Sequence, residues 1–214
     1  MTLVVSLKNP IIFLSMVLPN AIQPNFLEVL RNKVGLSKLE IQEFLEYWES
    51  KNLKKKEFHL TPGDICRVTA YVNKGCLRRY VIGENTKESI TNFATEDWWV
   101  GDLESFFLEK PTPYYIQALE DCELLVLSRA NFLCLTEKFP KYKTFHEEKI
   151  QRTFFATLNR VSTAKTDSPE EKYLQLIKQQ PGLFQRIPLH YIASYLGIEP
   201  ESLSRLRKRL SNKS

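Results

Sequence analysis

The chain has 214 residues, a size between that of one large domain and two small ones. Hydrophobic residues make up 43% and aromatic residues 12% of the sequence, which supports a packed core and excludes a disordered or collagen-like chain. The charge is uneven: residues 1–150 carry 19 Lys and Arg against 20 Asp and Glu, whereas residues 151–214 carry 11 against 5. A basic terminal segment on a neutral body is typical of phosphate-backbone binding, although a solvated basic helix has the same composition.

The first 24 residues are an N-terminal extension of unknown role. Its uninterrupted apolar and serine run covers only residues 11–18, which is too short to span a membrane. The residues that follow this run are a poor signal-peptide cleavage site. We therefore expect no membrane association and no secretion, and Met16 is an alternative start.

Residues 26–48 carry apolar side chains at helical spacing, and Ser37 with Glu40 has the pattern of a capping box. This pattern predicts two short helices.

From residue 57 to residue 128 the apolar period shortens to that of β-strands. Turn residues such as Pro62-Gly63 recur about every ten residues, a rhythm typical of an antiparallel barrel or sandwich rather than of βαβ units. The predicted strands cover residues 58–60, 67–72, 75–82, 89–94, 114–119 and 122–127.

The cysteines show no spacing typical of metal ligands, and no Cys–x–x–Cys pair occurs. Their apolar neighbours predict buried, reduced thiols, which favours a cytoplasmic protein without a metal site. These cysteines are Cys66, Cys76, Cys122 and Cys134.

Helical spacing returns after residue 128, with a short helix predicted at 131–139 and a long one at 142–164. One face of the long helix holds Ile150, Phe154, Leu158 and Val161. This stripe either packs against the barrel or pairs with the same helix of a second copy, and the pattern alone does not separate the two.

A new helix begins at Ser168-Pro169, with Glu171 completing a second capping box, so a domain boundary is expected near residue 166. Further on, Gly197 ends one helix where a positive φ is needed, and Pro200 begins the next. These features predict a helix-turn-helix.

The second helix of this predicted motif has a buried stripe of Leu203, Leu206 and Leu210, which leaves a polar face opposite. The start of a recognition helix contacts base edges in the major groove, while flanking cations contact phosphates. We expect Glu201, Ser204 and Arg205 to read bases, Arg205 by two hydrogen bonds to guanine. The predicted phosphate contacts are Ser202, Arg207, Lys208, Arg209 and His190.

Residues 187–210 resemble the DNA-binding motif of the CRP/FNR superfamily of bacterial transcription regulators, and Glu201-Ser202-Leu203-Ser204-Arg205 resembles the Glu-x-x-Ser-Arg signature of its FNR-like branch. Gly101-Asp102-Leu103 resembles the Gly-Glu-Leu of the cyclic-nucleotide-binding β-roll, and the helix at 142–164 resembles the dimerisation helix of the family. The segments WWVGDLESF and IASYLGIEPESLSR together are similar to a subgroup typical of Bacteroidetes.

The resemblance covers about residues 25–210 and implies an α+β fold, in which an antiparallel β-roll with flanking helices precedes a long dimerisation helix and a helix-turn-helix. The implied domains are an extension at 1–24, a β-roll at 25–136, a dimerisation helix and hinge at 137–166, and a DNA-binding domain at 167–214. It also implies double-stranded DNA, RNA polymerase and a second copy of the chain as partners.

One departure from the family concerns its effector. Where the cAMP-binding members carry an Arg-Ser pair that holds the cyclic phosphate, this chain has Thr112 and Pro113. A buried phosphate without an arginine would be an unpaired charge. Arg78 or Arg79 could supply one, but adjacent strand residues point to opposite faces, so at most one points inward. We therefore expect no cAMP cofactor.

If an effector pocket exists, we expect it at Trp99, Gly101, Asp102, Leu103, Thr112 and Pro113, with Trp98 and Phe106 also lining it and the long helix at 142–164 as its wall. Plain core packing of the tryptophans is the alternative to a ligand stack.

The main hypothesis is a homodimeric transcription regulator that binds a palindromic site. A second hypothesis is a β-roll without a ligand that serves as a dimerisation and polymerase-contact platform. A third is a cupin-like metalloenzyme with a DNA-binding tail, but such sites need several histidines and the barrel segment contains only His59. We expect His59 and His146 on the surface, and no enzymatic activity.

Overall fold

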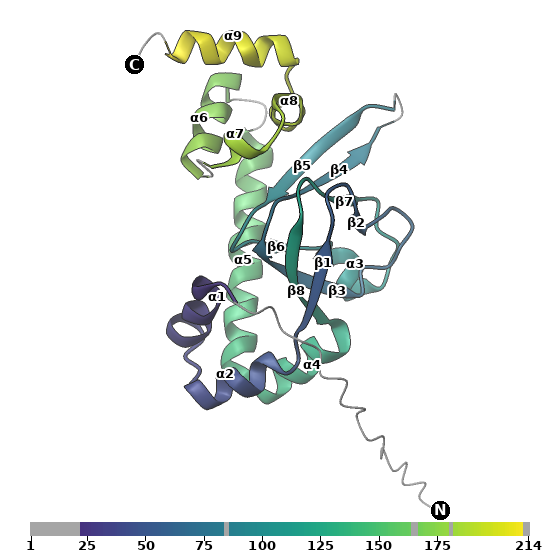
Figure 1. Ribbon diagram of the computed structural model, residues 1–214, viewed down its shortest axis with the longest axis vertical. Coiled ribbons are helices and arrows are strands. Elements are labelled where there is room, and N and C mark those ends of the chain that lie inside the picture. Colours follow the sequence, from purple (N-terminus) through teal and green to yellow (C-terminus); the bar gives the residue numbers. More distant parts are fainter. Residues whose placement is uncertain (1–21, 84–85, 164–166, 180–181, 212–214) are drawn as a thin grey trace, which may run out of the picture.

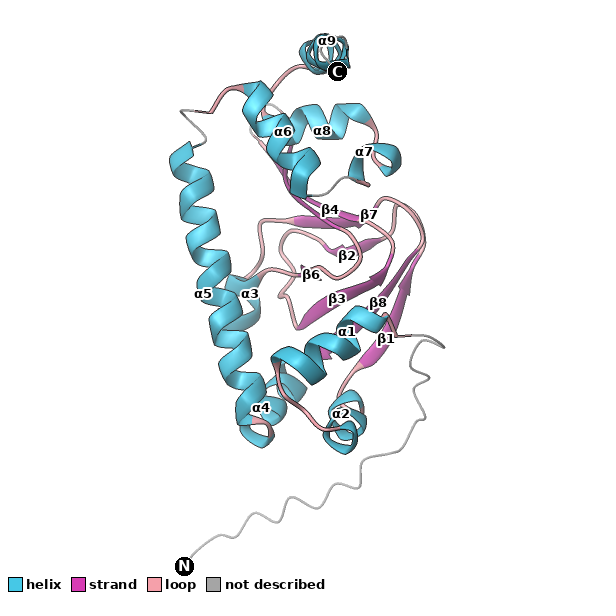
Figure 2. Cartoon of the chain, turned by 90° about the vertical axis from the view of Figure 1, so that its left-hand side faces the viewer, coloured by secondary structure: helices cyan, strands magenta, loops and turns pink. Residues whose placement is uncertain are grey.

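The computed structural model of the protein describes residues 22–83, 86–163, 167–179 and 182–211 (Figure 1). A roll of β-strands lies beside one long helix, and a group of C-terminal helices lies at one end of both (Figure 2). The strands are β1 (Glu49–Leu53), β2 (Phe58–Leu60), β3 (Val68–Lys74), β4 (Leu77–Ile82), β5 (Glu88–Ala94), β6 (Trp99–Val100), β7 (Tyr115–Ala118) and β8 (Cys122–Ser128).

Helices precede and follow the strands along the chain, and one helix lies between two of the strands. The helical elements are α1 (Pro24–Glu28), the π-helical turn η1 (Val29–Lys33), α2 (Lys38–Leu45), α3 (Leu103–Leu108), α4 (Arg129–Lys138), α5 (Pro140–Thr163), α6 (Pro169–Gln179), α7 (Leu183–Arg186), α8 (Leu189–Leu196) and α9 (Pro200–Ser211). The predicted capping box is present at the start of α2, where Ser37 accepts from the Glu40 N–H and the Glu40 side chain accepts from the Ser37 N–H.

The roll consists of two four-stranded antiparallel sheets, with strand orders β1-β8-β3-β6 and β2-β7-β4-β5. The predicted α+β architecture with an antiparallel β-roll is therefore confirmed. Six strands lie close to their predicted positions, whereas β1 and β6 were missed: β1 lacks a clear alternation and β6 has only two residues.

The sheet β2-β7-β4-β5 contributes side chains to a core on each of its two faces. On β7, Ile116 and Ala118 belong to the core inside the roll, while Tyr115 and the following Leu119 pack against a second core on the other side. This second core also contains the apolar faces of α6, α8 and α9, including Ile192 and Leu203. The C-terminal helices therefore complete their core with the outer face of the roll.

Two burial predictions for histidines were wrong. The pairing of β2 with β7 shifts register between Phe58 and Leu60, so strict alternation fails and both His59 and Leu60 are buried. His146 lies on α5 and is buried, with its ring centroid 4.7 Å from that of Phe132 of α4. Burial, with the charge of Lys149 second, lowers the pKa of His146 to about 4.

The cysteine prediction holds for three positions and fails at one. Cys66, Cys76 and Cys122 are buried free thiols, but Cys134 is exposed. Its neighbour Leu133 is also exposed, because α4 turns only Phe132 and Leu135 toward the core. Apolar neighbours in sequence were therefore a poor guide to burial on this helix.

Acidification should destabilise the protein through His146. The unfolded chain protonates this histidine near pH 6.5, whereas the folded chain excludes the proton until about pH 4, so stability falls through this window. At about pH 5 the cost for this residue is about 2 kcal/mol. Urea unfolding at pH 7 and at about pH 5 measures the decrease in the free energy of unfolding on acidification. This decrease should be about 2 kcal/mol smaller in His146→Gln than in the natural chain. His190→Gln, at an exposed position, is the control, and an equal change in both variants would contradict the assignment.

Candidate nucleic-acid interface and effector pocket

The turn between α8 and α9 has the local geometry that the sequence predicts. Gly197 has φ of 70°, and the Ile198 N–H donates to the Ala193 carbonyl, which closes α8. The N–H groups of Ser202 and Leu203 donate to the Glu199 carbonyl at the start of α9. Leu203 and Leu206 are buried in the second core, so α9 is anchored by its apolar stripe.

The opposite face of α9 points away from the protein. Glu201, Ser204 and Arg205 are all exposed, and the Arg205 guanidinium donates to the Ser202 hydroxyl at 3.3 Å. The structure thus brings the three predicted base-reading side chains onto one accessible surface. We call this surface, formed by Glu201, Ser204 and Arg205, the α9 face.

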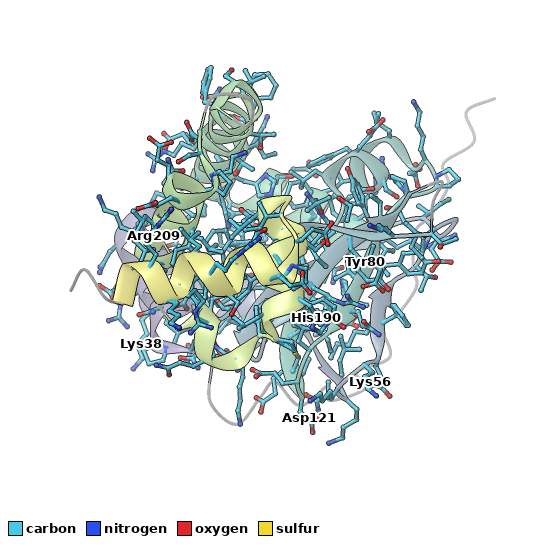
Figure 3. All side chains as sticks on the ribbon, turned by 90° about the horizontal axis from the view of Figure 1, so that it is seen from above. Lys38, Lys56, Tyr80, Asp121, His190 and Arg209 are labelled. Atoms are coloured by element: carbon cyan, nitrogen blue, oxygen red, sulfur yellow. The ribbon has the colours of Figure 1, made fainter. Side chains whose placement is uncertain are left out.

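The predicted phosphate contacts surround the α9 face. Seen from above, α9 crosses the top of the molecule, with Arg209 toward one end and His190 beyond the other (Figure 3). Arg207, Lys208 and His190 are exposed, whereas Ser202 is half-buried. Arg209 forms an ion pair with Glu170 of α6, so its guanidinium has a carboxylate partner within the chain.

The predicted effector residues Asp102 and Thr112 are buried and bound to each other. The Thr112 hydroxyl donates to Asp102 Oδ2 at 2.7 Å, and Asp102 Oδ1 accepts from the N–H groups of Glu104 and Ser105 at the start of α3. A carboxylate with these three donors is an N-cap held in place by a buried hydroxyl. It is therefore occupied by the chain itself rather than presented to a ligand.

The remaining residues of the predicted pocket do not converge. Leu103 and Pro113 are exposed, and Trp98 is 39% exposed. The Trp99 ring packs against Phe26, Trp48 and Tyr71, which is core packing rather than a ligand stack.

The Lys149 ammonium lies over the Trp99 ring, 3.9 Å from its centroid. Burial, aided by the charge of Lys33, lowers the pKa of Lys149 to about 7. This lysine on α5 is a neighbour of the roll that the sequence did not point to.

A small cavity marks where the effector pocket was expected. It measures about 40 Å³ and is bordered by Arg79, Asn92 and Gly101, among others, whereas ligand pockets usually measure about 300 to 1,000 Å³. Arg79 is the inward member of the Arg78-Arg79 pair, as strand alternation requires. Its Nε donates to the Thr91 hydroxyl, and its guanidinium lies 4.6 Å from the Tyr114 ring centroid, so it has partners of its own.

A wider hollow of about 470 Å³ lies at the loop between β2 and β3 and adjoins the predicted pocket residues. The Thr112 N–H donates to the Asp64 carbonyl, and the Asp102 N–H donates to Cys66 Sγ. His59 borders it, but the buried Nε2 of this ring has no hydrogen-bond partner among the residues that the structure describes. Burial, followed by the charge of Lys51, lowers the pKa of His59 to about 3. Within the described ranges, no group of three His, Cys, Asp or Glu side chains could hold a metal ion.

The predicted dimerisation stripe on α5 is largely uncovered. Phe154 is 58% and Leu158 47% exposed, and the adjacent Phe155 is exposed as well, while Ile150 is half-buried. The side chain of Val161 lies outside the described residues. Phe154 and Leu158 therefore do not pack against the roll of their own chain, which was one of the two expectations. None of the helices in the described part of the chain has the length and apolar character of a membrane span.

Comparison with known proteins supports this architecture. Residues 50–139 match the sequence profile of the cyclic nucleotide-binding domain family. Beyond this match, the chain shares the fold of solved regulators of the CRP/FNR type. No curated protein matches the chain.

Solved structures share the CRP/FNR fold over most of the chain. The c-di-GMP responsive global regulator CLP of Xanthomonas campestris aligns with a TM-score of 0.65 and 14% identity, over 83% of this chain and 93% of that one. The catabolite activator protein of Thermus thermophilus aligns with a TM-score of 0.54 and 23% identity, over 84% of this chain and 85% of that one. A CooA variant from Carboxydothermus hydrogenoformans aligns with a TM-score of 0.63 and 18% identity, over 87% of this chain and 84% of that one.

The hydrogen bond between Thr112 and Asp102 should stabilise the cyclic nucleotide-binding domain. Thr112→Val removes the hydroxyl and leaves one buried oxygen of Asp102 without that donor, which should cost about 1 to 3 kcal/mol in urea unfolding. Thr112→Ser keeps the hydroxyl and should cost less. Equal losses in the two variants would show that the methyl group, and not the hydrogen bond, is what matters.

Proposed function

We propose that this protein is a homodimeric, sequence-specific DNA-binding transcription regulator. The observation that carries the proposal is the α9 face: Glu201, Ser204 and Arg205 are exposed together on the second helix of a helix-turn-helix whose apolar side is buried. This is the arrangement in which a helix can enter the major groove and present base-reading side chains. The surplus of 11 Lys and Arg over 5 Asp and Glu in residues 151–214 supports phosphate contacts.

Dimerisation through α5 is the second part of the proposal. An exposed row of Phe154, Phe155 and Leu158 along a long helix costs free energy in water and would be covered by the same row of a second copy. A two-fold dimer would then read a palindrome with half-sites about 34 Å apart. We also infer RNA polymerase as a partner, a cytoplasmic location, and no enzymatic activity.

The proposed regulator does not respond to cAMP. The small volume of the cavity, about 40 Å³, and the hydrogen bond between Asp102 and Thr112 support this view. The same observations favour the second candidate function, a roll that has no small ligand and serves as a dimerisation and polymerase-contact platform.

Arg205 should determine one G·C pair in each half-site. Arg205→Ala removes a side chain that can donate two hydrogen bonds to guanine, so it should cost about 1 to 3 kcal/mol at that base and flatten the discrimination there. Binding of palindromic duplexes with each base at that position measures this effect. Arg207→Ala should instead weaken all duplexes equally. Uniform weakening by Arg205→Ala would make Arg205 a phosphate contact and contradict its assignment.

Isothermal titration with cAMP and with cGMP should show no binding heat, because the cavity at Gly101 measures only about 40 Å³ and Arg79 beside it already donates to Thr91. Palindromic-DNA binding, measured with and without each nucleotide, should be unchanged. Tight nucleotide binding that raises DNA affinity would overturn this part of the proposal and restore a cyclic-nucleotide switch.

A further inference from the structure

The C-terminal helices are attached to the roll at the outer face of β4 and β5. Within the described residues, the most extensive contact of α6–α9 with the rest of the chain is that of α8 against β5. Figures 1 and 2 both show these helices above the β4–β5 end of the roll. The Ser194 hydroxyl of α8 donates to the Glu88 carbonyl and accepts from the Ile90 N–H. Since β5 is an edge strand, Ser194 satisfies two backbone groups that have no neighbouring strand.

Arg78 of β4 is the centre of one side of this contact. Its side chain is only 5% exposed, and its guanidinium lies between two rings, 4.2 Å from the Tyr80 centroid and 4.1 Å from the Tyr191 centroid of α8. Its nitrogens also donate to the Gln117 amide oxygen and to the Glu88 carboxylate. A planar guanidinium can stack on two rings and fork to a carboxylate at once, which a lysine cannot do.

Arg186, which ends α7, is the centre of the other side. Its guanidinium donates to both carboxylate oxygens of Glu96, at 2.7 and 3.0 Å, and also to Glu120. Glu96 accepts in addition from the Gly75 N–H. Burial opposes the ionisation of Glu96, but the hydrogen bonds from Arg186 and Gly75 outweigh it and hold the pKa of Glu96 below its ordinary value.

These two arginines cross the same interface from opposite sides. Arg78 reaches from the roll to Tyr191 of the C-terminal helices, and Arg186 reaches from those helices to two carboxylates of the roll. We call the pair of contacts around Arg78 and Arg186 the arginine clasp. Each arginine has several fixed partners, so the clasp resists rotation as well as separation.

We propose that Arg78 and Arg186 are positioning residues for DNA binding, which hold the α9 face at one orientation relative to α5. The inference rests on the proposed function, because it concerns how a dimer spaces its two α9 helices. In a dimer joined through α5, the distance between the two α9 faces depends on how each C-terminal helix group is fixed to its own roll. The clasp therefore sets the spacing of half-sites that the dimer accepts.

The test measures spacing selectivity of the full chain. The probes are palindromic duplexes whose half-site centres lie about 10 base pairs apart, and the same duplexes lengthened or shortened by one or two base pairs. In the natural chain, each change of spacing should lower the affinity for the duplex about tenfold or more. A rigid dimer cannot place both α9 faces on half-sites whose spacing has changed. In Arg78→Lys/Arg186→Gln, the same changes should lower affinity less than about threefold.

A merely structural role of the two arginines would not flatten this profile. A duplex with a single half-site reports whether α8 and α9 are intact, and its affinity should be the same in both proteins. Arg129→Gln is the matched control: it removes an ion pair with Glu109 that does not cross the interface, so its profile should stay sharp. If the double variant does not fold, Arg78→Lys alone carries the test, because it keeps a positive charge beside Glu88 while losing the two-sided stacking.

Three results decide the matter. A flattened profile with unchanged half-site affinity supports the clasp as the spacing device. A profile as sharp as that of the natural chain overturns the inference and leaves the proposed function intact. If the natural chain binds no inverted repeat at any spacing, the proposed function fails, and the inference fails with it.

Discussion

The two-faced burial of the sheet β2-β7-β4-β5 is the constraint on which the rest of the structure depends. Successive strand residues point to opposite sides, so this sheet supplies Ile116 and Ala118 to the roll interior, and Tyr115 and Leu119 to a second core. The C-terminal helices bury their apolar faces in that second core. The sheet is thus the wall between the two halves of the molecule and belongs to both.

The same alternation gives Arg78 and Arg79 different environments. Arg79 points inward, where it borders the small cavity of the cyclic nucleotide-binding domain and bonds to Thr91. Arg78 points outward, where it lies between Tyr80 and Tyr191. One strand therefore contacts the expected effector pocket on one side and the helix group of the α9 face on the other.

The expected effector pocket is filled from within. The Thr112 hydroxyl and two backbone N–H groups satisfy the Asp102 carboxylate, and the Trp99 ring completes an aromatic cluster with α1. A buried carboxylate with three donors is stable without a ligand, so the roll needs no bound molecule to be satisfied. This is consistent with a regulator whose α9 faces are oriented by contacts within the chain.

Some features follow from local rules and could be predicted from the sequence: the capping box at Ser37, the closing of α8 at Gly197, and the apolar stripe of α9 all concern residues within one turn of each other. Base-reading candidates and the absence of an arginine at Thr112 could be identified for the same reason.

Only the tertiary structure decided what depends on distant segments. His59 lies on β2, which pairs with β7, and His146 packs against Phe132 of the neighbouring helix. Thr112 is hydrogen-bonded to Asp102 across α3, and Arg78 contacts Tyr191 more than a hundred residues later. Residue patterns specify which faces are apolar, but packing between elements decides which face meets which partner.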